Sequence, residues 1–264
     1  MNISKYRIVQ PKLKQEKLRI LHISDSHFGR KASFEEKTQR MTDILQAAES
    51  LCPDVIAMTG DLVSRTADEE ALKFGYMLLR MLSRKAPVLY VFGNHETTLP
   101  EEMRISLLQK IGELDIHILN NASVNLCGVD FFGYVLPNSC YKNENGSYRR
   151  LEKCSWTEIR KAIGERGENP NILLAHNPMG LDAYADWGAD VVLSGHVHGG
   201  IVRLPLIGGV LSPERKFFPK YTKGCYEHEG TKMVVSAGIG KLRFFNPAEI
   251  VCVDLVRDGA ECLK

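Results

Sequence analysis

The segment that best indicates the architecture of this 264-residue chain reads Leu18-Arg19-Ile20-Leu21-His22-Ile23-Ser24-Asp25-Ser26-His27. Its first part is rich in apolar residues and ends abruptly in polar ones, which is typical of a buried strand. Two residues able to bind a metal ion, Asp25 and His27, follow this strand two positions apart. If the chain stays extended there, both side chains leave on the same face and can reach one ion.

Four more apolar runs end in the same way, and they predict further strands at 54–59, 88–92, 171–175 and 190–194. Helical patterns at 35–51 and 68–84 separate the first three strands, and Pro53 and Pro87 stand where those helices should stop. This alternation predicts consecutive β-α-β units with parallel strands.

The second half of the chain alternates less regularly. A period of two around Cys127-Gly128 predicts an antiparallel hairpin at 122–135, so we expect mixed sheets in an α/β fold. No linker is evident, and we therefore expect a single domain spanning residues 1–264. Weaker patterns predict helices at 156–166 and 180–187, strands at 233–236 and 250–256, a surface loop at 137–150, and a long structured loop at 199–224.

Composition places the chain among soluble globular proteins, with 44% hydrophobic and 25% charged residues. The formal charge of +2 gives no electrostatic footprint for nucleic-acid binding, so no dedicated binding of this kind is expected. The first seventeen residues lack the apolar core of a signal peptide. The seven cysteines are odd in number and never form Cys-x-x-Cys, which favours mostly buried free thiols in a reducing compartment. We expect a cytoplasmic protein.

Histidine positions carry the strongest functional signal, because strand ends are where α/β folds build their sites. Five of the eight histidines come directly after a predicted strand: His27, His95, His176, His196 and His198. Taken alone, each has a simpler interpretation. His176 could be a hydrogen-bonded core residue, and Gly195-His196-Val197-His198-Gly199-Gly200 could be a polar turn, although its glycines would suit close approach to ions.

The candidate ligands that offer an oxygen atom also follow predicted strands. Asp61 follows a predicted strand and Gly60, where alone it would be interpreted as a helix cap or turn. Asn94, within Gly93-Asn94-His95-Glu96, offers an amide oxygen beside an imidazole. Mixed oxygen and nitrogen ligands without thiolate favour Mn²⁺, Fe or Zn²⁺ over Ca²⁺, without choosing among the three. Taken together, the strand ends supply seven candidate metal ligands: Asp25, His27, Asp61, Asn94, His176, His196 and His198.

In their order, these motifs resemble the calcineurin-like metallophosphoesterase superfamily, with the likeness running from about residue 18 to residue 240. The resemblance implies a four-layer αββα sandwich of two mixed sheets flanked by helices. It implies that Asp61 bridges two ions and that His95 is catalytic. Ser64 stands where the family often has an aspartate. The resemblance assigns one ion to Asp25, His27 and His198, and the other to Asn94, His176 and His196.

A finer likeness lies in segments 199–205 and 244–250. These resemble a bacterial branch that includes phosphodiesterases and UDP-2,3-diacylglucosamine pyrophosphatase-like enzymes. Members of that branch commonly carry an N-terminal membrane anchor or export signal, which this sequence does not show. The resemblance implies hydrolysis of a phosphodiester or phosphomonoester through a metal-bridging hydroxide. The alternatives are a pyrophosphatase acting on a nucleotide-sugar lipid and an inactive scaffold with the same fold; a nuclease is disfavoured by the balanced charge.

Substrate contacts are expected from Asn94, His95 and Arg203. The loop at 201–221 directly follows the last ligands, so we expect it to form a substrate wall. Its apolar residues could meet a lipid or membrane surface, but packing on the core is the favoured interpretation. These residues are Leu204, Leu206, Ile207, Phe217 and Phe218.

Overall fold

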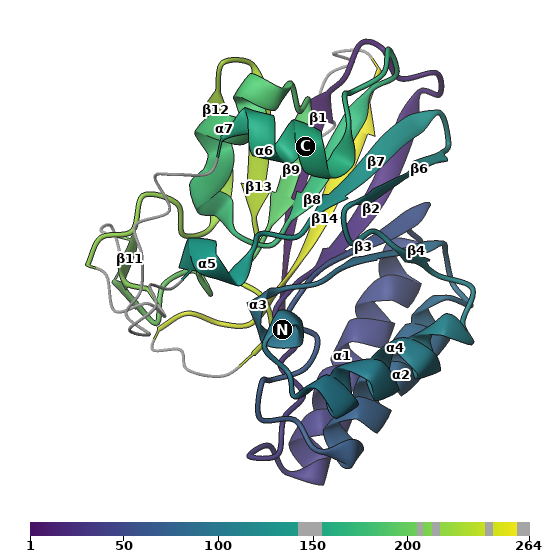
Figure 1. The fold of residues 1–264 in the computed structure, drawn as a ribbon, viewed down its shortest axis with the longest axis vertical. Coiled ribbons are helices and arrows are strands. Elements are labelled where there is room, and N and C mark those ends of the chain that lie inside the picture. Colours follow the sequence, from purple (N-terminus) through teal and green to yellow (C-terminus); the bar gives the residue numbers. More distant parts are fainter. Residues whose placement is uncertain (142–154, 205–207, 213–216, 241–244, 258–264) are drawn as a thin grey trace.

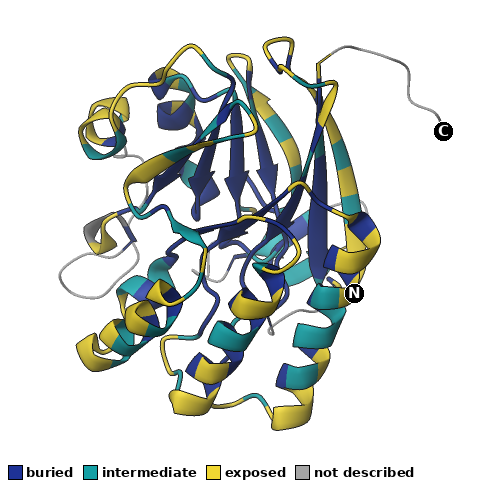
Figure 2. Ribbon diagram, turned by 90° about the vertical axis from the view of Figure 1, so that its right-hand side faces the viewer, coloured by how far each residue is buried: buried dark blue, intermediate teal, exposed yellow. Residues whose placement is uncertain are grey.

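Two six-stranded sheets pack face to face, and helices cover both outer faces (Figure 1). The computed structural model describes residues 1–141, 155–204, 208–212, 217–240 and 245–257. The expected four-layer αββα architecture is thereby confirmed. Most strands are buried between the helical layers, while exposed residues line the outer helix faces (Figure 2).

The first sheet combines parallel and antiparallel pairs. Strand β14 runs parallel to β1 and antiparallel to β2, and the strands from β2 to β5 are all parallel. In spatial order its members are β1 (Asn2–Val9), β14 (Glu249–Val256), β2 (Lys17–Ile23), β3 (Val55–Thr59), β4 (Val88–Val91) and β5 (His117–Ile118).

The second sheet is also mixed. Its outer pairs, β12 with β13 and β6 with β7, are antiparallel, and the remaining pairs are parallel. The β6–β7 pair confirms the hairpin expected at 122–135. In spatial order the sheet contains β12 (Gly224–His228), β13 (Thr231–Val235), β9 (Val191–Ser194), β8 (Asn171–Ala175), β7 (Val129–Tyr134) and β6 (Ala122–Leu126).

Helices pack on each sheet through apolar faces. On the first sheet lie α1 (Phe34–Leu51), α2 (Glu69–Leu82) and α4 (Glu101–Gly112); on the second lie α6 (Trp156–Ile163) and α7 (Leu181–Trp187). Helix α1 begins at a capping box formed by Ser33 and Glu36, which satisfies backbone N–H groups at its first turn. Two short helices, α3 (Asn94–Thr97) and α5 (Asn138–Tyr141), lie in loops between strands.

A third apolar cluster fills the space between the sheets. It joins Ile20 and Val55 of the first sheet to Phe131 and Leu174 of the second. Because β2, β3 and β4 are parallel, their carboxyl ends reach the same edge, and the same holds for β8 and β9. The loops that carry the predicted ligands leave the sheets from these ends.

The structured loop expected at 199–224 contains an antiparallel strand pair, β10 (Val202–Leu204) with β11 (Gly208–Leu211), which we did not predict. The favoured packing of its apolar residues on the core was wrong for Leu204, Phe217 and Phe218, which are exposed. Leu206 and Ile207 lie outside the described residues, as does 142–150 of the loop expected at 137–150.

Cysteine burial differs from expectation as well. The four described free cysteines include three that are exposed, Cys52, Cys127 and Cys225, whereas Cys252 is buried on β14. In the described part of the chain, no helix combines the length and apolar character that crossing a membrane requires.

Candidate metal centre

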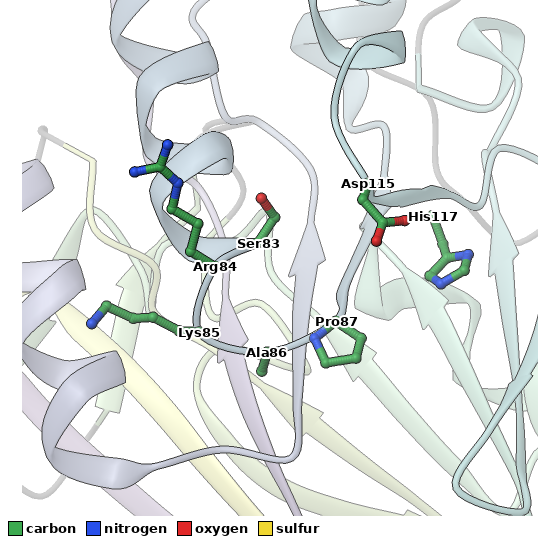
Figure 3. Close-up of a pocket in the computed structure, with 7 residues that line it drawn as sticks. All are labelled: Ser83, Arg84, Lys85, Ala86, Pro87, Asp115 and His117. Carbon is green, nitrogen blue, oxygen red and sulfur yellow. The ribbon is translucent and has the colours of Figure 1, made fainter.

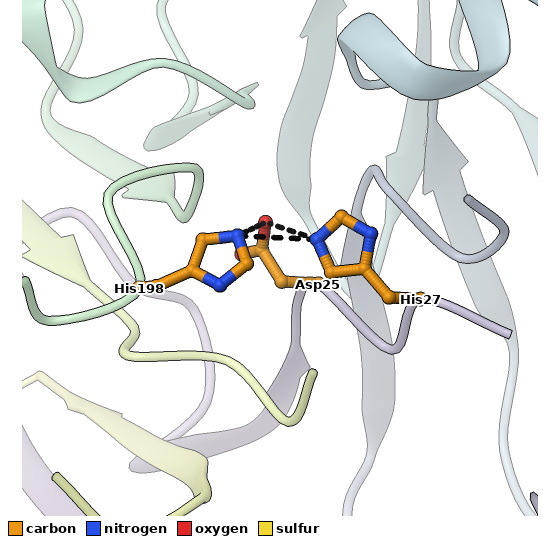
Figure 4. Close-up of side chains that lie close together, drawn as sticks. All are labelled: Asp25, His27 and His198. Atoms are coloured by element: carbon orange, nitrogen blue, oxygen red, sulfur yellow. Dashed lines mark hydrogen bonds and ion pairs between the residues drawn. The ribbon is translucent and has the colours of Figure 1, made fainter. Parts of the chain in front are cut away.

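Asp25, just beyond β2, is fully buried and uses its two carboxylate oxygens differently. Oδ2 accepts hydrogen bonds from the His196 backbone N–H at 3.0 Å and from the Ser24 hydroxyl at 2.5 Å. Oδ1 lies 3.6 Å from His27 Nε2 and 3.4 Å from His198 Nε2 (Figure 4). Since the two imidazole Nε2 atoms are 3.1 Å apart, three possible ligand atoms converge on one point.

Asp61, just beyond β3, also uses its two carboxylate oxygens differently. Its Oδ1 accepts a hydrogen bond from the His95 backbone N–H at 2.9 Å. Its Oδ2 lies 3.3 Å from His176 Nε2, 3.6 Å from His27 Nε2 and 3.8 Å from His95 Nε2. One ligand atom each from Asp61, His176 and His196 lie within 4.8 Å of one another. Asp61 therefore lies between two groups of possible ligands.

Three buried polar atoms of these residues make no hydrogen bond of ordinary geometry: Asp25 Oδ1, Asn94 Oδ1 and His176 Nε2. Buried polar atoms are nearly always paired, so three such atoms at neighbouring strand ends need an explanation. A cation satisfies a carboxylate oxygen, an amide oxygen and an imidazole nitrogen together. The donor set therefore fits divalent metal ions.

Electrostatics favour the same conclusion. Burial alone would raise the pKa of Asp61, but the charges of His176 and His95 hold it well below its usual value, and His198 does the same for Asp25. Burial lowers the pKa of His176, yet the nearby Asp61 and Asp25 outweigh it and raise that pKa to about 10. The two carboxylates thus create a strongly negative potential, which favours an extra proton on His176. A bound cation would neutralise the same potential in place of that proton.

The backbone at this site is unusual. Five of the seven predicted ligands adopt left-handed conformations with φ between 48° and 68°: Asp25, His27, Asp61, His196 and His198. Our reason for grouping Asp25 with His27, an extended chain, was therefore wrong, because β2 ends at Ile23 and the chain turns sharply at both residues. Side chains are held in such conformations only where the surrounding structure fixes them, and such residues cluster at functional sites.

Glycine at 195 lets the second sheet approach the first at this point. A Cβ atom there would collide with the Ser24 hydroxyl and the Asp25 carboxylate. The backbone N–H of the next residue, His196, can consequently reach Asp25. This explains why glycine precedes the histidine pair.

His95 follows Asn94 in helix α3, and its environment fixes its tautomer. The Arg65 backbone N–H donates to His95 Nδ1 at 3.2 Å, and burial lowers the pKa of His95 to about 4. At neutral pH the imidazole is consequently neutral, with its proton on Nε2, the atom that faces Asp61. His95 can therefore donate one hydrogen bond into the site.

Two residues to which we assigned no role from the sequence hold the loops of the predicted ligands. The buried Glu96 carboxylate accepts backbone N–H groups from Asp61 at 2.8 Å, Gly93 at 2.9 Å and Val63 at 3.1 Å, joining the loops after β3 and β4. Asn246 donates from Nδ2 to the carbonyl oxygens of His198 and, at 3.1 Å, Gly200. Their signals were present, since Glu96 ends the Gly93–Glu96 motif and Asn246 lies in the 244–250 segment.

The structure also places the remaining polar candidate. Arg203, on β10, donates from Nη1 to the Gly199 carbonyl oxygen at 3.3 Å. It thereby supports the backbone of the loop that follows His198. This contact leaves the predicted role of Arg203 in substrate binding as a prediction.

A separate pocket lies near the amino-terminal ends of β4 and β5 and is lined by residues 83–87, Asp115 and His117 (Figure 3). Arg84 and Lys85 point in different directions rather than toward a common centre (Figure 3). The metal-binding candidates follow the carboxyl end of β4, so this pocket is not part of the candidate site.

Comparison with known proteins agrees with this geometry. The family model for calcineurin-like phosphoesterases matches residues 18–200, a span that contains all seven predicted ligands. Phosphodiesterase YaeI of Escherichia coli K12 is 24% identical, over 85% of this chain and 76% of YaeI. UDP-2,3-diacylglucosamine pyrophosphatase LpxG of Chlamydia muridarum is 25% identical, over 88% of this chain and 82% of LpxG.

Among solved structures, TT1561 of Thermus thermophilus superimposes with a TM-score of 0.54. The superposition covers 84% of this chain and 89% of TT1561, with 15% sequence identity. At that identity the likeness extends to the fold alone.

Proposed function

Because the chain belongs to the calcineurin-like phosphoesterase family, we propose that this metal-dependent hydrolase cleaves phosphodiesters or phosphomonoesters with two divalent ions. The observation that carries the proposal is the set of three buried atoms without an ordinary hydrogen bond, Asp25 Oδ1, Asn94 Oδ1 and His176 Nε2. Each belongs to a residue that the family resemblance assigns to a metal. The position of all three residues just beyond strand ends supports a dinuclear centre.

We divide the predicted ligands into two groups, using the geometry for the aspartates and histidines and the family resemblance for Asn94. Asp25, His27 and His198 would hold one ion, since their ligand atoms lie within 4.8 Å of one another. His176, His196 and Asn94 would hold the other, with Asp61 shared between the two. Mn²⁺, Fe and Zn²⁺ all suit this mixture of oxygen and nitrogen ligands. When bound, such a pair lowers the pKa of a water molecule and offsets charge on the phosphoryl group.

The protein's own side chains orient the predicted ligands and donate hydrogen bonds to the substrate. Hydrogen bonds from His196 and Ser24 fix the Asp25 carboxylate, so its free oxygen keeps one orientation. The neutral His95 presents Nε2–H toward the site, where it can donate a hydrogen bond to a phosphoryl or leaving-group oxygen. Asn94, as a neighbour of His95, would also contact the substrate.

A pyrophosphatase acting on a nucleotide-sugar lipid is a second candidate. It is favoured by the likeness to LpxG, which is named as a UDP-2,3-diacylglucosamine pyrophosphatase. The likeness to YaeI, named as a phosphodiesterase, favours the first candidate. Both would use the same ions and the same His95, so substrate tests must separate them. An inactive scaffold would have had no need to retain all seven ligands.

The test is hydrolysis of bis-p-nitrophenyl phosphate and p-nitrophenyl phosphate by metal-stripped protein, before and after addition of Mn²⁺, Zn²⁺, Fe²⁺ or Mg²⁺. We expect metal-dependent release of nitrophenol, and we expect Asp61→Asn to abolish it. Asp130→Asn, on β7 outside the site, is the matched control and should retain activity. If folded protein loaded with each metal cleaves neither ester, a UDP-sugar lipid pyrophosphate is tested next, and failure there contradicts the proposal.

A further inference from the structure

An aromatic patch stands on the surface beside the metal centre. We define it as Phe217, Phe218 and Phe245, whose exposed fractions are 73%, 67% and 82%. With Phe34, these are the four most exposed large apolar side chains among the described residues. Leu204, on β10, is also exposed. Large apolar side chains gathered in one region usually mark a contact surface, whereas single scattered ones do not.

Backbone contacts connect the segments that carry the patch. Phe217 forms an antiparallel bridge with Leu211 of β11, and the Phe218 N–H donates to the Val210 carbonyl oxygen at 2.8 Å. Asn246, the residue after Phe245, donates to the carbonyl oxygen of Gly200 just before β10. Phe217 and Phe218 therefore lie against the small β10–β11 sheet, which projects from one side of the molecule (Figure 1), and Phe245 lies beside the segment that leads into β10.

The same contacts tie the patch to the candidate metal centre. Asn246 also donates to the carbonyl oxygen of His198, one of the predicted ligands. Gly199 and Gly200 then lead directly from His198 into β10. A surface engaged by the patch would consequently lie next to the phosphoester-binding side of the protein.

Backbone conformation is a second, independent signal. Phe218 and Phe245 have φ values of 50° and 57°, in the left-handed region that bulky residues rarely occupy. An exposed aromatic side chain gains little from such a conformation in the isolated chain. Unfavourable backbone geometry of this kind is typical of positions kept for binding.

Charge in the sequence distinguishes the possible occupants. Segments 213–220 and 241–245 contain five basic residues and one acidic residue, although the whole chain carries a net charge of only +2. Lys220, which is described, has a 66% exposed side chain and lies 3.8 Å from the equally exposed carboxylate of Asp182, a weak surface ion pair. Protein interfaces deplete lysine at their centres, whereas aromatic and basic residues together suit the surface of an anionic bilayer.

We infer that the aromatic patch docks on a bilayer containing anionic phospholipid, with Phe217, Phe218 and Phe245 inserted among the headgroups. This goes beyond hydrolysis of a phosphoester, because it assigns a binding surface and a partner. Docking needs no catalysis, so it can be measured separately from the proposed activity.

The test is co-sedimentation of the full chain, loaded with Mn²⁺, with sucrose-filled vesicles. One set contains phosphatidylcholine alone, and the other contains two parts phosphatidylcholine to one part phosphatidylglycerol. We expect preferential binding to the anionic vesicles, weakened by added salt. The triple variant Phe217→Ser/Phe218→Ser/Phe245→Ser should lower the partition coefficient about tenfold or more. Melting curves and metal content report whether it is folded.

The matched control is Phe34→Ser, because Phe34 is 68% exposed but lies at the first turn of α1. It should bind vesicles as the wild type does. If the triple variant does not fold, the single variants Phe245→Ser and Phe217→Ser replace it, each with a smaller loss. The inference is overturned if the wild type binds neither vesicle type, or if the patch variants bind as well as the wild type. A second copy of the chain would be the partner instead if the wild type bound no vesicles and eluted as a dimer in gel filtration, and if the patch variants eluted as monomers.

Discussion

At the scale of single residues, His95 gives the sharpest prediction. Replacing it by asparagine removes the Nε2–H that faces the site but leaves Asp61, His176 and the other predicted ligands in place. We expect His95→Asn to keep its metal content and to lose about 100-fold or more in kcat on bis-p-nitrophenyl phosphate. His228→Asn, on β12, is the control and should turn over normally. Wild-type turnover by His95→Asn would remove this residue from the mechanism.

The site residues could be predicted from the sequence, but the contacts that hold them could not. The order of the five motifs was enough to nominate Asp25, Asp61 and the histidines. Their left-handed backbones were not predicted, because that conformation depends on contacts from the opposite sheet, such as the His196 N–H to Asp25. Glu96 was missed for the same reason, since its three partners lie in loops that the sequence does not align.

His22 predicts how stability depends on pH. It is fully buried on β2, where burial lowers its pKa to about 4 and its Nε2 lies 2.8 Å from the Thr59 hydroxyl. The unfolded chain, with a pKa near 6.5, therefore binds this proton more readily than the folded chain. The contribution of neutral His22 to the free energy of unfolding is fully present above pH 6.5 and is lost as pH falls toward 4. Between pH 7 and pH 5 this contribution should fall by about 2 kcal/mol.

Urea unfolding of metal-free protein at those two pH values measures this effect. His22→Gln lacks the titrating group, so its free energy of unfolding should change less between pH 7 and pH 5 than that of the wild type. His228→Gln, whose side chain is 38% exposed, should behave as the wild type does. Equal slopes for wild type and His22→Gln would exclude His22 as the source.

At the scale of elements, strands were predicted best where apolar runs end at a predicted ligand. The strands β2, β3, β4, β8 and β9 were all expected, because buried parallel strands form continuous apolar runs. Strand β1 and helix α4 were missed. Strand β1 lies at a sheet edge and buries only Ile8, and α4 buries only Leu107 and Ile111. Weak burial leaves a weak pattern in the sequence.

Asn246 predicts how one loop supports the centre. Its side chain holds the carbonyl oxygens of His198 and Gly200, so Asn246→Ala should let the ligand loop move. We expect about tenfold weaker metal binding by competition with a chelator, at nearly unchanged stability of the sheets. Asn125→Ala, on exposed β6, is the control. Unchanged metal affinity in Asn246→Ala would show that the loop is held by other contacts.

At the scale of the whole molecule, the two sheets depend on each other. Neither can bury its inner face alone, and the His176 imidazole reaches across to the Thr59 carbonyl oxygen at 2.6 Å. We therefore expect residues 1–264 to unfold as one domain, with a single thermal transition followed equally by far-ultraviolet and near-ultraviolet circular dichroism. Two separated transitions would show that the sheets are independent units.

The dinuclear centre also belongs to this scale, because each ion would draw ligands from both sheets. The most direct test is titration of metal-free protein with Mn²⁺, measuring bound metal and hydrolysis of bis-p-nitrophenyl phosphate on the same samples. We predict two ions bound per chain, with full activity only when both are present, and loss of binding in Asp61→Asn. Full activity with one ion or none, or two ions bound equally well by Asp61→Asn, would contradict the account.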